Sequence, residues 1–354
     1  MKPSLYNRVL ISFFAILFII ISFFMLWVEP YKGDLCRIGG YRENDYGWNL
    51  PQKRFKDCHY TIGKNLSDYD EYYDIVTIGD SFSVNEKQSW QNHLALTTGA
   101  KILTFHRRSV TASSLLQHEQ FIKTPPKVFI FQVVENGIQT ALFDVALDEH
   151  QLFHNEDSKS IKAFDKKKIN YDKHIEAFSR GRNQNFSMDS AIHHIKTNLK
   201  QLFGSRLKAK PYKLKSDKKL FSNNKQNEAL FYYLDNLKLS ISSDEWAIIE
   251  KRFATLQHQA QANGKTRFLA MIVPDKTTAY ADFIEDIKPK YKSVLEYMPK
   301  KYSVNWINLE EIFKKSLHSS SPIKDLYLPN DSHWGYEGYM VAGNLIANDL
   351  SATR

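Results

Sequence analysis

The sequence predicts an α/β fold with a mostly parallel sheet, and three observations support it. Short apolar runs typical of buried strands alternate with segments of helical periodicity from Ile75 onward. The run at 127–134 is apolar on both faces, as expected for a central strand of a parallel sheet. The run Ile75–Ile78 ends abruptly in Gly79-Asp80-Ser81, which indicates a strand entering a tight turn.

The first half of this domain is predicted to alternate strands with helices. Gly99 is a typical C-cap for the first helix, and Pro125-Pro126 ends the second. Alternation of this kind implies crossover connections and a doubly wound sheet. The predicted elements are strand 75–78, helix 86–98, strand 101–105, helix 112–123 and strand 127–134.

Residues 148–240 interrupt this alternation and are interpreted as an insertion in the sheet domain. The stretch is rich in Lys, Asn, Asp and Ser. An amphipathic helix is predicted near 189–203, and its apolar face holds Ile192, Ile195, Leu199 and Leu202. The basic run 208–219 is interpreted as a mobile, solvated loop, with contact to an anionic membrane or polymer as the alternative.

The alternation resumes at Ser243, which is predicted to cap a helix that ends near Gly264. The buried stripe of this helix is expected to be Trp246, Ile249, Phe253 and Leu256. The later predicted elements are strand 267–273, helix 280–298, strand 304–309 and a closing helix at 335–350.

The N-terminal stretch 9–28 is almost entirely apolar and carries no charge. It is long enough to form a transmembrane helix. A cleaved signal peptide is the alternative, but its apolar core is normally shorter and no convincing cleavage site follows. We therefore expect an uncleaved anchor with residues 1–8 in the cytoplasm. Residues 29–72 form a polar, aromatic lead-in that packs on the domain at 73–354.

The residues suited to catalysis are Ser81, His333 and Asp331. A turn after a buried strand places Ser81 at the carboxyl end of the sheet, beside a helix N-terminus. Serine needs a base to become a nucleophile, and Asp331-Ser332-His333 supplies a histidine with an orienting carboxylate. The alternatives are a helix-capping serine and a metal-binding Asp/His pair, but the latter lacks further ligand spacing nearby.

Four short motifs stand at the predicted strand ends and in the loop before the last helix. They are Gly79-Asp80-Ser81-Phe82-Ser83, Gln132-Val133-Val134-Glu135-Asn136, Val273-Pro274-Asp275-Lys276 and Asp331-Ser332-His333-Trp334. Together these motifs resemble an SGNH (GDSL-type) esterase or acyltransferase domain. More narrowly, the chain resembles membrane-anchored, AlgJ/AlgX-like polysaccharide O-acetyltransferases and their DltD-like relatives. The resemblance covers roughly residues 40–350 and implies a three-layer α/β/α fold.

The resemblance also implies an oxyanion hole built from Ser81 and Asn136. The family's glycine is missing from the second loop, where Ser109 or a neighbouring amide would replace it. The expected substrate-binding set is Lys276, Asp275, Glu135 and Trp334. A structural ion pair is an equal alternative for Asp275 and Lys276, and packing beneath the loop is the favoured role for Trp334.

The expected function is transfer of acetyl, or another short acyl group, onto hydroxyls of a cell-surface polysaccharide. The resemblance implies a single-pass protein of the bacterial inner membrane with a periplasmic domain. It also implies a multi-pass membrane acyltransferase as acyl supplier. No metal or nucleotide cofactor motif is present. The alternatives are an anchored carbohydrate esterase with the same triad and a non-catalytic polysaccharide-binding subunit.

The formal net charge of +9 is compatible with nucleic acid, anionic lipid, an acidic polymer or simply a dispersed basic surface. No nucleic-acid-binding motif is present, so we expect no nucleic-acid partner. In an oxidising compartment Cys36 and Cys58 are expected to form a disulfide, with two unrelated thiols as the alternative.

Overall fold

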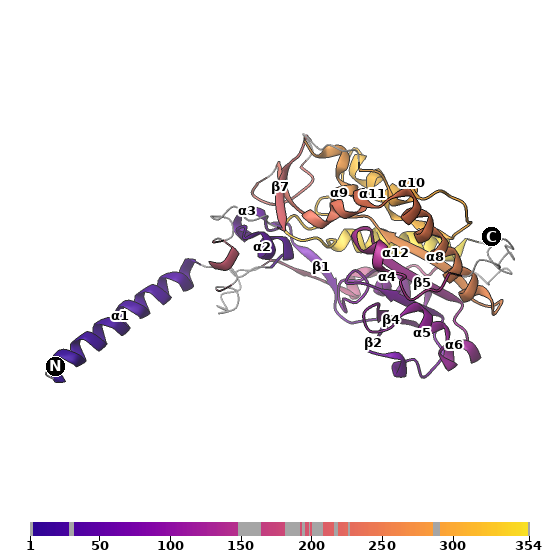
Figure 1. Ribbon diagram of the computed structural model, residues 1–354, viewed down its shortest axis with the longest axis horizontal. Helices are drawn as coiled ribbons and strands as arrows, with labels where there is room; N and C mark the ends of the chain where they lie inside the picture. Colours follow the sequence, from indigo (N-terminus) through magenta and orange to yellow (C-terminus); the bar gives the residue numbers. More distant parts are fainter. Residues whose placement is uncertain are drawn as a thin grey trace.

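The computed structural model consists of a long N-terminal helix, α1 (Pro3–Trp27), and an α/β domain from which this helix extends (Figure 1). The described residues are 3–27, 32–147, 164–180, 192, 195–197, 199, 208–215, 219–225, 227–285 and 291–352.

The centre of the domain is a six-stranded sheet in the order β10-β9-β5-β3-β4-β2. Every neighbouring pair in it runs parallel, as the alternation of strands and helices predicts. The chain passes from β3 to β4 on one side and then to β5 on the other, so the strand order reverses at β3. The carboxyl end of β3 is therefore the topological switch point, where ligands bind in open α/β sheets. The strands are β2 (Thr61–Gly63), β3 (Ile75–Gly79), β4 (Ile102–His106), β5 (Val128–Val134), β9 (Arg267–Val273) and β10 (Trp306–Asn308).

Both faces of the sheet are buried under apolar side chains. In β5, Val128 and Ile130 enter one hydrophobic cluster, whereas Phe129 and Phe131 enter another. Successive side chains of a strand point to opposite faces, so the two clusters lie on opposite sides of the sheet. This explains why run 127–134 is apolar throughout.

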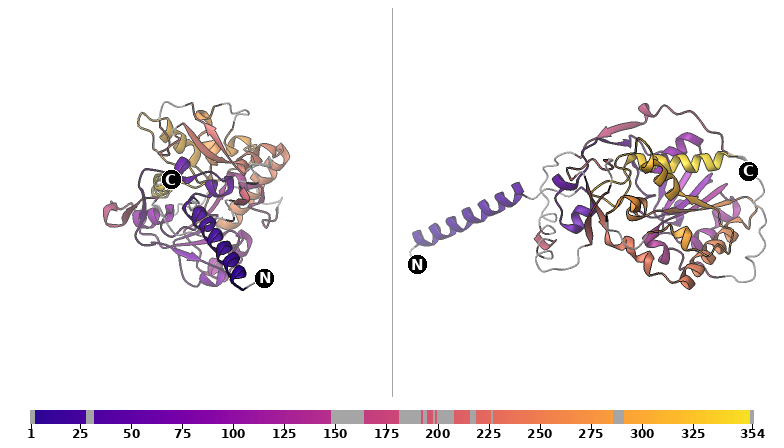
Figure 2. Two further views of the ribbon diagram at one scale, coloured as in Figure 1. Left: turned by 90° about the vertical axis from the view of Figure 1, so that its left-hand side faces the viewer. Right: turned by 90° about the horizontal axis from the view of Figure 1, so that it is seen from above.

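Helices contribute to both clusters and cover both faces (Figure 2). The first cluster includes α4 (Trp90–Thr98), α11 (Leu309–His318) and α12 (Tyr336–Ser351). The second includes α5 (Ala112–Leu116), α6 (Glu119–Lys123) and α8 (Ser243–Gln261).

Local sequence signals fix the helix ends, with small differences from the predicted bounds. Ser89 caps α4 by accepting from the N–H of Asn92, and Gly99 follows in the left-handed conformation with φ of 69°. The cap of α8 is Ser242, one residue before the predicted Ser243, because Glu245 can then complete a reciprocal capping box. The predicted stripe of α8 is buried, from Trp246 to Leu256.

Two predicted helices are wrong in extent. The predicted helix 112–123 is split by His118, whose backbone is extended and whose side chain caps α6. In place of helix 280–298 the chain has α9 (Lys276–Ala279), the 3₁₀ helix η5 (Ala281–Phe283) and α10 (Val294–Tyr297). Ile284 is extended because it forms a bridge with Leu214, and this pairing outweighs the helical pattern.

The lead-in and the insertion are more regular than the sequence predicts. Residues of the lead-in form α2 (Asp34–Gly39), α3 (Glu43–Tyr46), β1 (Gln52–Phe55), the edge strand β2 and the 3₁₀ helix η1 (Leu66–Asp68). Three residues are too short a run to be recognised as a strand, so β2 was not predicted.

In the insertion, β6 (Ile175–Phe178) pairs antiparallel with β1, and β7 (Ala209–Lys213) pairs antiparallel with β8 (Glu228–Tyr232). The basic run 208–219 is therefore partly a strand rather than a mobile loop. Of the helix predicted near 189–203, residues 192, 195–197 and 199 are helical, and the others, including Leu202, lie outside the described residues. The remaining 3₁₀ helices are η2 (Glu135–Thr140), η3 (Tyr171–Lys173) and η4 (Tyr233–Ser240).

Among the described residues, α1 is the one helix long and apolar enough to cross a membrane. Its window Leu5–Ser22 has a mean hydropathy of 2.1 and no buried residue. A single apolar helix near the N-terminus is consistent with the anchor predicted at 9–28, and a signal sequence would pass the same test of length and composition.

The predicted disulfide between Cys36 and Cys58 is absent, and both thiols are free. Cys36 lies in α2 and packs with Leu35, Ala209 and Leu230 in a small apolar cluster. Cys58 is exposed, and its Sγ donates to the carbonyl of Tyr60 at 3.2 Å. The two sulfur atoms are thus held by different neighbours, which corrects the pairing expected from the sequence.

Candidate active site

The turn after β3 is locked by two buried polar side chains, Asp80 and Gln132. The Asp80 carboxylate accepts from the backbone N–H of Phe82 at 3.1 Å and of Val134 at 2.8 Å. Gln132 donates to Asp80 at 2.9 Å and accepts from the Asp80 N–H at 2.9 Å. These bonds tie the turn to β5 and leave Ser81 exposed at the carboxyl end of the sheet.

Gly79 is needed because the turn has no room for a side chain there. A Cβ at this position would lie 2.5 Å from the Ser83 hydroxyl and 2.6 Å from the Gln132 side-chain oxygen. Both atoms belong to the polar network under Ser81, since Ser83 also donates to Gln132 at 2.8 Å. The Gly-Asp-Ser sequence thus serves the shape of the turn as well as the position of the hydroxyl.

The second part of the site is the His333 loop, residues Asn330–Trp334, which precedes α12. His333 Nε2 lies 2.7 Å from Ser81 Oγ, and His333 Nδ1 lies 2.7 Å from Asp331 Oδ1. The same Asp331 oxygen accepts from the backbone N–H of His333 at 2.9 Å. The three residues predicted to act together therefore lie in one hydrogen-bonded chain, and the short Asp-x-His spacing lets the carboxylate bind both N–H groups.

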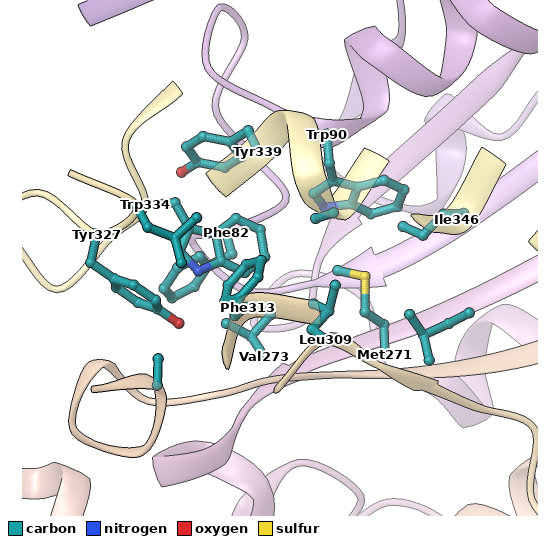
Figure 3. Packing of buried hydrophobic residues seen from close by; sticks show 14 of the residues in the cluster. Phe82, Trp90, Met271, Val273, Leu309, Phe313, Tyr327, Trp334, Tyr339 and Ile346 are labelled. Carbon is teal, nitrogen blue, oxygen red and sulfur yellow. The ribbon is translucent and has the colours of Figure 1, made fainter. Parts of the chain in front are cut away.

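Aromatic packing supports the loop from below. Trp334 is only 1% exposed and its ring lies 4.8 Å from that of Phe82 and 5.2 Å from that of Phe313, centroid to centroid (Figure 3). Phe82 also contacts the His333 ring, at 4.8 Å. Trp334 is thus buried in the core beneath the loop, where a substrate does not reach it.

Two carboxylates make the His333 imidazole unusually basic. Burial disfavours its charged form, but the hydrogen bond and the charge of Asp331 outweigh burial and raise the pKa of His333 from 6.5 to about 9. The pKa of Asp331 moves in the opposite direction: burial opposes its charge, yet its bonds to His333 hold the pKa well below its usual range. Such a pair can take a proton from Ser81 and hold it during attack on a carbonyl carbon.

The second carboxylate is Asp34 of α2, which the sequence analysis missed. Its Oδ2 lies 4.0 Å from His333 Nδ1, and its Oδ1 accepts from the Ser332 N–H at 2.8 Å. Asp34, Asp331 and His333 offer ligand atoms within 4.8 Å of one another, a spacing that a metal ion would accept. Oxygens of both carboxylates also accept hydrogen bonds within the site, from Ser332 and from His333.

Lys276 lies under the His333 loop rather than in a substrate groove. Its Nζ donates to the carbonyls of Leu328 at 2.6 Å, Pro329 at 3.1 Å and Asp331 at 3.2 Å. The side chain is 2% exposed, and burial lowers the pKa of Lys276 to about 7. This residue therefore holds the loop that carries His333.

Glu135 and Asp275 are also buried, in an ionic cluster around Lys238 of η4. Lys238 forms ion pairs with the Glu135 carboxylate and, at 3.2 Å, with Asp275. Glu135 further accepts from the Asp275 N–H at 2.9 Å. Burial raises the pKa of Asp275 well above its usual value. The structural alternative thus applies to Asp275, and Glu135 joins the ends of β5 and β9 instead of facing a substrate.

The three predicted oxyanion donors differ in their surroundings. The Ser81 N–H has no acceptor among the described residues. Asn136 donates from Nδ2 to Asp235 at 3.4 Å and from its backbone to Asp275 at 3.3 Å. The Ser109 N–H donates to the His106 carbonyl at 2.8 Å. Asn136 and Ser109 would have to leave these partners to bind an oxyanion, so Ser81 is the donor best placed in this conformation.

Comparison of the chain with family models, curated proteins and solved structures finds no match.

Proposed function

We propose that the chain is a membrane-anchored serine O-acyltransferase of SGNH type. It moves acetyl, or another short acyl group, to hydroxyls of a cell-surface polysaccharide. One observation carries the proposal: Ser81, His333 and Asp331 are joined by two hydrogen bonds of 2.7 Å at the switch point of a parallel sheet.

In the proposed first step, Ser81 Oγ attacks the carbonyl carbon of the acyl donor while His333 Nε2 takes the hydroxyl proton. The bond to the leaving group then breaks, and His333 returns the proton to the departing atom. This leaves an ester on Ser81. In the second step a sugar hydroxyl loses its proton to His333 and attacks that ester, and Ser81 regains its proton.

The exposure of the nucleophile favours a polymeric acceptor. Ser81 is exposed, and His333 retains 31% exposure of its side chain. A cavity of about 550 Å³ elsewhere in the domain, lined by Tyr302 and Trp306 among others, contains none of the three residues. An open site admits one hydroxyl of a long chain without enclosing the whole molecule.

The membrane location is part of the proposal. Helix α1 would anchor the protein in the bacterial inner membrane, with the α/β domain in the periplasm and the polysaccharide as its acceptor. A multi-pass membrane acyltransferase would supply the acyl group, because acetyl-coenzyme A is a cytoplasmic donor. These assignments follow the resemblance of the four motifs to anchored O-acetyltransferases.

A deacylating esterase would use the same atoms, with water in place of the sugar hydroxyl. To test this, the full-length protein in detergent is incubated with an activated acetyl ester, with and without oligosaccharide acceptors. Acetylated sugar and free acetate are then measured. Ser81-dependent acetylation of the sugar supports the transferase. Release of acetate alone at every acceptor concentration identifies an esterase. Folded protein that reacts with neither would indicate a binding subunit.

A further inference from the structure

The chain segment that follows α1 is bonded directly to the His333 loop. The Asp34 carboxylate accepts from both the backbone N–H and the hydroxyl of Ser332, the residue between Asp331 and His333. In return, the backbone N–H of Asp34 donates to Asp331 Oδ2 at 3.2 Å. Asp34 is thus bonded to Ser332 and Asp331, and its carboxylate lies 4.0 Å from the His333 imidazole.

The neighbours of Asp34 strengthen the same junction. The N–H groups of Leu35 and Cys36 both donate to the Asn330 carbonyl, at 3.0 and 3.3 Å. Gly33 packs so closely on Asn330 that a Cβ there would lie 2.1 Å from its carbonyl oxygen. The buried Glu43 accepts from the Gly33 N–H and from the Asn330 side chain, each at 2.8 Å.

We infer that the start of α2, at Gly33 and Asp34, is part of the site, and that Asp34 is a positioning residue that holds the His333 loop and the imidazole for acyl transfer. The kinetic part of this inference rests on the proposed function.

The junction between α1 and α2 also limits the distance between the site and the membrane. Trp27 ends α1 and Asp34 begins α2, so six residues lie between the two helices and Asp34 is seven positions beyond Trp27. A chain of that length spans at most about 25 Å. If α1 lies in a bilayer, the acyl donor has to reach Ser81 close to the membrane surface.

The Asp34 charge acts on the imidazole as well as on the loop. The charged and titratable groups that face His333 are Asp331, Asp34 and Asp80, and Lys276 lies beneath the loop. Burial, followed by the charge of Asp331, raises the pKa of Asp34 to about 6, so this carboxylate is ionised near neutral pH. Its removal should make His333 less basic, whereas the loss of a purely structural contact would leave the pH profile in place.

The experiment uses the full-length protein in detergent and measures acylation of Ser81 by p-nitrophenyl acetate across pH. Asp34→Asn keeps the shape and removes the charge, so the inflection should move to lower pH by about half a unit to one unit. Asp34→Ala should lower the acylation rate by about ten- to a hundredfold with little change in KM. The exposed Asp57→Asn is the matched control and should behave as the wild type.

A measurement independent of turnover separates the two proposals. NMR titration of the His333 ring in wild type and Asp34→Asn reports its pKa directly. In one outcome the wild-type protein is acylated normally, and Asp34→Asn changes neither the pH profile of acylation nor the His333 pKa. This result overturns the role of Asp34 and leaves the proposed function intact. An inactive wild type whose His333 pKa still falls in Asp34→Asn overturns the function but keeps the positioning role.

Discussion

At the scale of single residues, the pH dependence of the proposed acyl transfer depends on one imidazole. His333 has to be neutral to accept the Ser81 proton, and its pKa is raised to about 9 because the charge of Asp331 outweighs burial. Below that pH most of the imidazole is protonated. We therefore expect kcat/KM for acyl transfer to rise about tenfold per pH unit from pH 6 and to level off near pH 9.

Stopped-flow measurement of Ser81 acylation between pH 6 and 10 tests this expectation. Asp331→Asn removes the main cause of the shift and should lower both the inflection and, by about 10³–10⁴-fold, the rate. A profile that is flat from pH 6 upward would contradict the raised pKa.

Lys276 gives a second prediction at this scale. Lys276→Met keeps much of the side-chain volume but removes the donor to three carbonyls of the segment that carries His333. The loop then loses its support, and we expect kcat to fall by about tenfold or more with KM nearly unchanged. Lys219→Met, at an exposed position, is the control. Wild-type kinetics in the Lys276 variant would show that the aromatic packing and the bonds from Asp34 hold the loop without Lys276.

Some residues of the site can be predicted from the sequence and others cannot. Ser81, Asp331 and His333 were predictable because each stands in a short local pattern: a strand end before a tight turn, or two residues of one loop. Asp34 has no such pattern, since its role depends on a helix packing against a loop about 300 positions away. Lys276 was recognised as a site residue, but its direction is set by packing against Phe221 and Phe231, which sequence spacing does not show.

At the scale of elements, the turn after β3 has to be both tight and rigid. Gly79→Ala would push a methyl group against Ser83 and Gln132 and disturb the network that fixes Asp80. We expect the folded state to lose about 1–3 kcal/mol and the acylation rate to fall as well. Thermal unfolding in detergent and burst kinetics measure the two effects.

Gly137→Ala is the matched control for that turn. The nearest atom to a Cβ there is the end of the flexible Arg107 side chain, at 3.0 Å, which can move away. Equal unfolding temperatures and equal rates for the two alanine variants would mean that the turn tolerates a side chain.

Helices and strands were predicted correctly where the sequence pattern is long and local. They were predicted wrongly where pairing with a distant segment determines the backbone conformation. The strands at 127–134 and 267–273 and the stripe of α8 agree with the structure because their burial repeats over many residues. The predicted helix 280–298 is wrong because Ile284 pairs with Leu214 from the insertion. Strand β7 (Ala209–Lys213) was not predicted because of its charges: it pairs with β8 and keeps its lysines exposed.

At the scale of the whole molecule, labelling of the cysteines tests on which side of the membrane the domain lies. Cys58 is exposed and Cys36 is buried, and neither is in a disulfide. If α1 anchors an exported domain, a membrane-impermeant maleimide should label Cys58 in intact spheroplasts. Cys58→Ser should abolish the label, because Cys36 is shielded. Labelling that appears only after the membrane is opened would place the domain in the cytoplasm.

The central claim is that Ser81 carries an acyl group. The most direct measurement is intact-protein and peptide mass spectrometry of the full-length protein after brief exposure to an activated acetyl ester at pH 9, with Ser81→Ala as the control. The account predicts one added acetyl group, about 42 Da by its formula, on the peptide that contains Ser81, transient in wild type, prolonged when the acceptor is withheld and absent in Ser81→Ala. Folded wild-type protein with no adduct on Ser81, or an equal adduct in both proteins, would contradict it.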